Sequence, residues 1–184
     1  FFDEHKNKAK LENEKYIISS NQIMTAFLLK KYHDQVLPDT DRIRIKIPID
    51  LREIYPGIDS MYIGNAVFDN FTEFTKDEIN KMSMYEIAYR LKKSVMNARN
   101  ENYIKEISYL SEYGITFKED LFKTRPAFAN MDTDIVSSNM AHMNDLGALG
   151  IGEDKGHFVY IGIPTQTSFV MLKEKSGQIW AQIT

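Results

Sequence analysis

The chain has 184 residues, 43% hydrophobic and 27% charged, which excludes a disordered chain and predicts one soluble globular domain. It contains no cysteine, which excludes disulfide frameworks, thiolate metal sites and cysteine nucleophiles. The net charge of −3 argues against a dedicated nucleic-acid-binding protein, and no apolar run approaches the roughly 20 residues that a membrane helix needs. We therefore expect a cytoplasmic protein with no nucleic-acid partner and no transmembrane segment.

The first residues differ from the rest of the chain. Residues 1–15 are rich in Lys, Glu and Asn, which predicts a solvated linker or a frayed helix. Charged residues directly follow two Phe, which is unlike a signal peptide. The chain also begins without Met, which fits a fragment, a processed product or a partial sequence. We expect residues 1–15 to be a linker or the start of a fragment, and residues 16–184 to form one domain.

A helix and two strands are predicted next. Ser19 or Ser20 can cap a helix over residues 20–33, where apolar residues recur at three- and four-residue spacing. In residues 42–47 charged residues alternate with Ile, which predicts a strand with one buried face, ended by Pro48. Residues 61–68 predict a second strand, which Gly64 interrupts.

Two helices and several short strands complete the predicted order. Residues 75–112 have helical spacing with a break near three asparagines, and Gly114 is a candidate C-cap. Strands are predicted over 134–139, 157–163, 168–172 and 178–183, with a turn at 175–177 joining the last two. This order predicts an α+β fold with a mixed, largely antiparallel sheet flanked by helices.

The histidines give no metal-binding pattern. None of the four stands in a His-Glu-x-x-His spacing, so no metal site is predicted; they are His5, His33, His142 and His157. His33, beside Asp34 near a helix end, is interpreted as part of a solvated pair. His142, three residues before Asp145, is a candidate catalytic base, but nothing in the sequence shows a partner that would orient it.

Two further groups of residues have alternative interpretations. The glycines of residues 147–152 could cradle a phosphate, but a phosphate site needs a helix N-terminus. Because a strand is predicted to follow, a turn with positive φ angles is favoured. Asp50 and Arg52, directly after the first predicted strand, form either a solvated turn pair or a clasp in which a buried Arg binds a distant carboxylate.

Several short segments occur in a fixed order along the chain. They are residues 18–27 (ISSNQIMTAF), 47–52 (IPIDLR), 61–67 (MYIGNAV), 137–139 (SSN), 145–150 (DLGALG) and 178–183 (QIWAQI). In this order they resemble the C-terminal half of BAHD-type acyltransferases, which belong to the chloramphenicol-acetyltransferase-like superfamily. The resemblance covers about residues 16–184 and implies one half of a two-domain fold.

Each segment resembles a particular family motif. Asp50 and Arg52 stand in the Asp-x-Arg turn, and Gly64 and Asn65 in the Tyr-Phe-Gly-Asn strand. Ser137-Ser138-Asn139 falls where the family has Thr-Ser-Trp. The segment with Asp145, Gly147 and Gly150 resembles the Asp-Phe-Gly-Trp-Gly motif, without its aromatic residues and one residue longer.

The resemblance implies acyl transfer from a CoA thioester to an alcohol or amine, with acyl-CoA as a substrate and no covalently bound cofactor. The general base of the family is the His of a His-x-x-x-Asp motif in the N-terminal half. No His of this chain has Asp four residues later. The resemblance therefore implies no catalytic residue in this chain and a partner, the N-terminal half of the same enzyme.

The resemblance also implies roles for single residues. Ser137, Ser138 and Asn139 would line the acyl tunnel or stabilise the oxyanion, although the serines could equally end a strand. Asp145 would pair with Arg52 and hold its loop against the sheet. Asn65 would fix a bend through its side-chain amide, and Gly64 would permit a close backbone approach.

Three alternatives stay open at the level of function. The chain could be a condensation or carrier-protein-dependent domain of the same fold, which would take acyl-phosphopantetheine in place of acyl-CoA. It could be a non-catalytic binding or assembly module, since the base is absent and the motifs are altered. It could also be a free-standing enzyme that uses His142.

Overall fold

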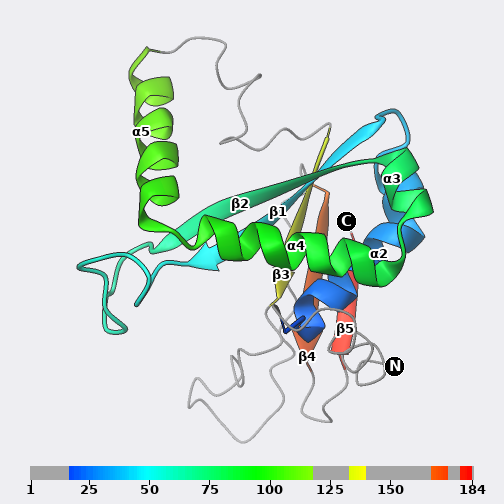
Figure 1. Cartoon of the computed structure of the whole chain (residues 1–184), viewed down its shortest axis with the longest axis horizontal. Coiled ribbons are helices and arrows are strands. Elements are labelled where there is room, and N and C mark those ends of the chain that lie inside the picture. The colour runs from blue at the N-terminus through cyan, green and yellow to red at the C-terminus, as the bar shows by residue number, and fades with distance from the viewer. Residues whose placement is uncertain (1–16, 118–132, 140–166, 174–178, 184) are drawn as a thin grey trace, which may run out of the picture.

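The computed structural model describes residues 17–117, 133–139, 167–173 and 179–183 (Figure 1). The linker predicted at 1–15, the strand predicted at 157–163 and the turn predicted at 175–177 lie outside these residues.

Among the described residues, five strands form one mixed sheet in the order β2-β1-β3-β4-β5. They are β1 (Arg42–Asp50), β2 (Val67–Thr75), β3 (Asp134–Asn139), β4 (Ser168–Lys173) and β5 (Ile179–Ile183). The β1–β2 and β4–β5 pairs are antiparallel, whereas β1–β3 and β3–β4 are parallel. The predicted mixed sheet is confirmed. The strands predicted over 134–139, 168–172 and 178–183 are also confirmed, as β3, β4 and β5.

In the described part of the chain, four helices accompany the sheet: α2 (Ser20–Val36), α3 (Lys76–Lys81), α4 (Met84–Ala98) and α5 (Glu101–Phe117). Ser83 begins α4 with a capping box in which its side chain accepts from the Glu86 amide. We predicted two helices over residues 75–112, but this cap starts a separate helix, so the region holds α3, α4 and α5. Gly114 lies inside α5 and is not its C-cap, because α5 continues to Phe117.

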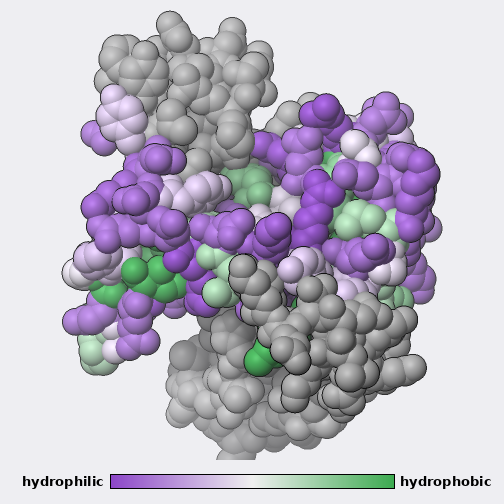
Figure 2. All heavy atoms as spheres, in the orientation of Figure 1, coloured by the Kyte–Doolittle hydropathy of each residue, from purple (hydrophilic) through white to green (hydrophobic). Residues whose placement is uncertain are grey.

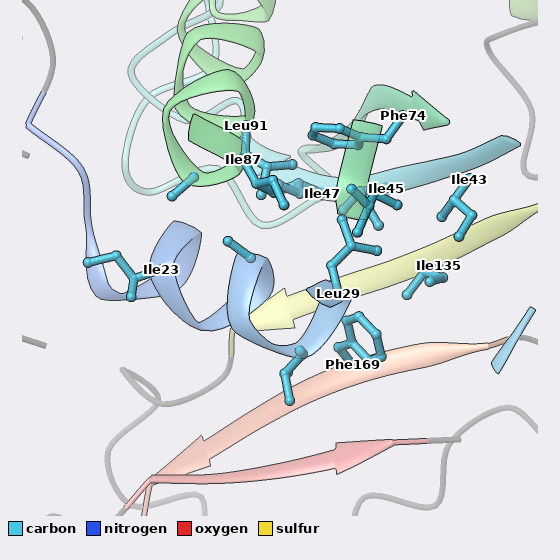
Figure 3. Packing of buried hydrophobic residues seen from close by; sticks show 14 of the residues in the cluster. Ile23, Leu29, Ile43, Ile45, Ile47, Phe74, Ile87, Leu91, Ile135 and Phe169 are labelled. Carbon is cyan, nitrogen blue, oxygen red and sulfur yellow. The ribbon is translucent and has the colours of Figure 1, made fainter. Parts of the chain in front are cut away.

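The core lies between one face of the sheet and the helices α2 and α4 (Figure 3). The alternation in β1 places all its Ile side chains on this face, and all are buried: Ile43, Ile45, Ile47 and Ile49. Leu29 of α2, Ile87 and Leu91 of α4, Ile135 of β3 and Phe169 of β4 pack against them. The structure thus confirms an α+β fold with helices flanking a sheet.

We predicted that Pro48 ends the first strand, and this is wrong. The strand β1 continues through Pro48 to Asp50. The Arg44 amide donates toward β3, to the Thr133 carbonyl at 2.9 Å. Since amides two residues apart point to the same side of a strand, position 48 also faces the β3 side. The β1–β3 pairing covers only residues 44–46, so Pro48 removes no hydrogen bond from either ladder.

The predicted second strand is also displaced. Residues 61–66 form irregular structure and turns, and β2 begins at Val67. Gly64 therefore lies in a loop, not inside a strand.

Candidate functional site

Three of the predicted motifs lie at one edge of the sheet. Because β1 and β3 are parallel, their carboxyl ends, Asp50 and Asn139, point to the same edge. The α2 helix runs opposite to β3, so its N-terminus starts at this edge as well (Figure 3). The Asp50–Arg52 turn, the end of β3 and the start of α2 thus share one edge, where ligands bind in many folds with parallel strands.

Ser137 is held by α2. It is 1% exposed, and its Oγ lies 2.7 Å from Oγ1 of Thr25, which is fully buried. The Thr25 hydroxyl donates to the Asn21 carbonyl at 2.9 Å, so Ser137 is the donor to Thr25. The hydroxyl proton of Ser137 is therefore committed to the contact between helix and sheet.

The neighbouring residues of β3 face both ways. Side chains alternate along a strand, so Ser138 points to the face opposite α2, and Asn139 points to the same face as Ser137. Ser138 and Asn139 are both half-buried.

Arg52 stabilises the loop 51–66, which joins β1 to β2, through hydrogen bonds to both ends of it. Its guanidinium donates to Oδ1 of Asp50 at 2.9 Å and to the carbonyls of Tyr62 and Gly64 at 3.1 Å each. The Arg52 amide also donates to Asp50 at 3.0 Å, and this bond is the main reason that the pKa of Asp50 is lowered. Arg52 is half-buried and acts within its own loop.

Gly64 and Asn65 shape the end of this loop. A Cβ at position 64 would collide with the ring of Tyr62, so only Gly fits without a shift of that ring. The side-chain carbonyl of Asn65 accepts from the Val67 amide at 3.2 Å, at the point where the chain enters β2.

The predicted segment 145–150 is not among the described residues. Asp145, Gly147 and Gly150 lie outside the described residues, as do His5, His142 and His157. The predicted Asp145–Arg52 pair stays a prediction. In the part of the chain that the structure describes, no three His, Cys, Asp or Glu side chains group together as metal ligands, and no helix is long and apolar enough to cross a membrane.

His33 is not part of a solvated pair, contrary to our prediction. It is 4% exposed, and its Nδ1 lies 3.0 Å from the Leu29 carbonyl one turn earlier. His33 follows Ala26 and Leu29 on the buried side of α2 at helical spacing, which places the ring in the interior. Only Asp34, its neighbour, is exposed, with its Oδ2 3.4 Å from Nε2 of the ring.

Sequence reasoning missed two buried polar contacts of β3, one at its start and one close to its carboxyl end. Arg44 binds Asp134 through two bonds of 2.7 and 2.6 Å across the β1–β3 pair, and Asp134 is fully buried. Thr25 was missed as the partner of Ser137. A weak signal existed for Thr25, because it is a polar residue on the apolar side of a predicted helix.

Solved structures share this fold at low sequence identity. The acyltransferase TRI101 of F. sporotrichioides, crystallised with coenzyme A and T-2, has a TM-score of 0.65 and 17% identity; the match covers 97% of this chain and 42% of that chain. TRI101 of F. graminearum, also with coenzyme A and T-2 mycotoxin, gives 0.64 and 21% identity, covering 97% of this chain and 41% of that chain. Vinorine synthase gives 0.59 and 11% identity, covering 100% of this chain and 41% of that chain.

No protein-family model and no curated protein sequence matches the chain. The chain spans less than half the length of these solved neighbours. The likeness that the sequence motifs predicted is confirmed at the level of the fold. This chain has the fold of part of a BAHD acyltransferase.

Proposed function

We propose that this chain is the C-terminal domain of a CoA-dependent acyltransferase that moves an acyl group from a thioester to an alcohol or amine. The observation that carries the proposal is the match of 97% of this chain to a protein crystallised with coenzyme A and T-2. The order of the sequence motifs supports the C-terminal position. The catalytic His is then supplied by an N-terminal half, because no His-x-x-x-Asp occurs in the chain.

The chemistry divides between the two halves. The His of the N-terminal half would take the proton of the acceptor, whose oxygen or nitrogen would attack the thioester carbonyl. The C–S bond would then break, and the CoA thiolate would leave with the proton returned by the His. The end of β3 would contribute polar groups to the acyl tunnel or the oxyanion. We assign this role to Ser138, which points away from α2, because the proton of Ser137 is already donated to Thr25.

Arg52 keeps donors for the proposed pair with Asp145. A guanidinium has five N–H groups, and the contacts with Asp50, Tyr62 and Gly64 use three of them. A carboxylate of the 145–150 segment could therefore bind the same guanidinium without displacing the loop 51–66. This pair would attach the 145–150 segment to the sheet edge described above.

The test is acyl transfer by the complete polypeptide that contains this chain. Release of free CoA from acetyl-CoA is followed with a panel of alcohols and amines that includes T-2, the compound bound to the TRI101 neighbours. We expect that replacing the upstream His by Ala lowers the rate at least about 100-fold. The His142→Ala variant is the control and should keep its activity. Undiminished turnover in the upstream His variant would refute the proposal.

A non-catalytic binding module is the second candidate, favoured by the altered 145–150 motif and the absence of a base in the chain. This candidate predicts no turnover with any donor and no affinity for acetyl-CoA by calorimetry. Transfer from an acylated carrier protein, but not from acetyl-CoA, would instead identify the carrier-dependent class.

A further inference from the structure

The loop 51–66 is a compact closed structure. The Leu51 amide donates to the Ala66 carbonyl at 2.7 Å, which joins the two ends of the loop. Inside it, the Glu53 amide donates to Ile58 at 2.8 Å, and the Ile58 amide to Tyr55 at 3.0 Å. The loop projects beyond the sheet at the left of Figure 1. Closed, internally bonded loops of this length are frequently functional.

Three adjacent apolar residues of the loop are exposed to solvent. Its tip, defined as Met61, Tyr62 and Ile63, has exposed fractions of 79%, 43% and 100%. Val67, where the loop enters β2, is 52% exposed. Figure 2 shows hydrophobic side chains on the surface at the left, where Figure 1 places this loop.

Arg52 holds the tip in this orientation. The two carbonyls that its guanidinium binds belong to Tyr62 and Gly64, the residues on either side of Ile63. The backbone around Ile63 is thus fastened inward while the side chain of Ile63 points into solvent. Three adjacent exposed apolar side chains on a fastened loop form a contiguous patch, and such patches mark surfaces that another polypeptide covers.

We propose that the tip of the loop 51–66 docks on the remainder of the acyltransferase fold, the portion that this chain does not span. This inference rests on the proposed function. The match covers only 42% of the TRI101 chain of F. sporotrichioides. More than half of that chain therefore lies outside the part that matches this one. The tip is then the surface of this chain that meets the additional part.

The charge of the loop favours this occupant over two others. Residues 50–66 contain Asp50, Glu53 and Asp59 against Arg52 as the one basic residue, so 1 − 3 gives a net charge of −2. A second copy of the same loop would bring like charges together, and an anionic lipid surface would repel the loop. The surface that receives the tip should be an apolar recess bordered by basic residues.

Photo-crosslinking in the complete polypeptide tests the contact. A benzophenone amino acid replaces Ile63, the protein is irradiated, and the cross-linked peptides are identified by mass spectrometry. We expect cross-links within the same polypeptide, to residues outside the 184 residues of this chain. Cross-links to a second copy, to this chain alone, or to nothing would overturn the proposal. The control places the benzophenone at Lys93 of α4, an exposed and charged residue, and should give no cross-link to the additional part.

A charged substitution gives a second measurement. In the complete polypeptide, Ile63→Asp should accelerate amide hydrogen exchange of residues 61–64 at least tenfold, because the docked tip is released. Tyr109→Asp should leave exchange in these residues unchanged. Unchanged exchange in the Ile63→Asp variant would contradict the docking.

The docking and the proposed function can fail separately. Cross-links to the additional part without CoA release would support the docking surface and refute the catalytic role. CoA release without these cross-links would support the catalytic role and refute the docking surface.

Discussion

The buried pair of Arg44 and Asp134 gives the sharpest test of how this fold is held together. The two bonds of 2.7 and 2.6 Å join β1 to β3, and the side chains are 15% and 0% exposed. Phe71 of β2 lies beneath the guanidinium, whose carbon is 4.8 Å from the ring centroid. Asp134→Ala removes the carboxylate and leaves the Arg44 charge with little access to water.

Breaking a buried ion pair by removing one partner costs about 3–5 kcal/mol of the free energy of unfolding. A domain of this size is stable by only about 5–15 kcal/mol, so the loss is a large share of the total. At about 2–4 °C per kcal/mol, the unfolding temperature should fall by about 6–20 °C. Arg44→Met combined with Asp134→Leu should recover much of this loss, because neither charge then stays buried alone.

The strand contains its own control. Arg42 and Glu73 form a pair of the same type at 2.9 Å on the same face of β1, but their side chains are 72% and 49% exposed. Glu73→Ala should therefore cost less than about 1 kcal/mol. Urea unfolding followed by circular dichroism measures all the variants. Equal losses for Asp134→Ala and Glu73→Ala would refute the argument that burial decides the magnitude.

Three further predictions concern the helices and the loop 51–66. Ser137→Ala and Thr25→Val should each cost about 1–3 kcal/mol in urea unfolding, and the double variant clearly less than their sum; strict additivity would contradict the buried hydroxyl pair. Lys30, which donates to carbonyls at the end of α3 at 2.6 and 3.0 Å, should cost about 1–2 kcal/mol on replacement by Met, whereas exposed Lys93→Met should be neutral in the same assay. The hydrogen bond from the Arg52 amide is the main reason that the pKa of Asp50 is lowered below 3.8. The contribution of this carboxylate to the free energy of unfolding is therefore complete above pH 3.8 and is lost as the pH falls through the pKa of the folded state. A carboxyl chemical-shift titration with a midpoint at or above 3.8 would contradict this.

Regular patterns near each other in sequence were predicted well. The alternation of Ile with charge identified β1, and the helical spacing identified the α2 region. The segment 61–66 misled us because it is rich in strand-forming residues. Its actual conformation depends on Arg52, whose side chain reaches 10 and 12 residues along the chain to two carbonyls, and residue pattern does not encode such contacts.

The candidate site was predictable only in part for the same reason. The resemblance identified the residues of the Asp-x-Arg and Gly-Asn motifs, and the structure brings them into one loop. It did not reveal that Ser137 is bound to Thr25, 112 residues earlier in the chain. That contact arises from the packing of α2 on β3, which depends on the position of the whole helix.

The parallel pairing of β1 with β3 has a consequence for how the chain is made. The two strands pair at Arg44 and Asp134, 90 residues apart, and such distant contacts slow folding. At about 5–20 residues per second, roughly 4–18 s of synthesis separate the two residues. During that time β1 can pair with β2 on one side only, and its other edge stays open to foreign strands. Arg44 and Lys46 place positive charge beside this edge, which would discourage aggregation until β3 arrives.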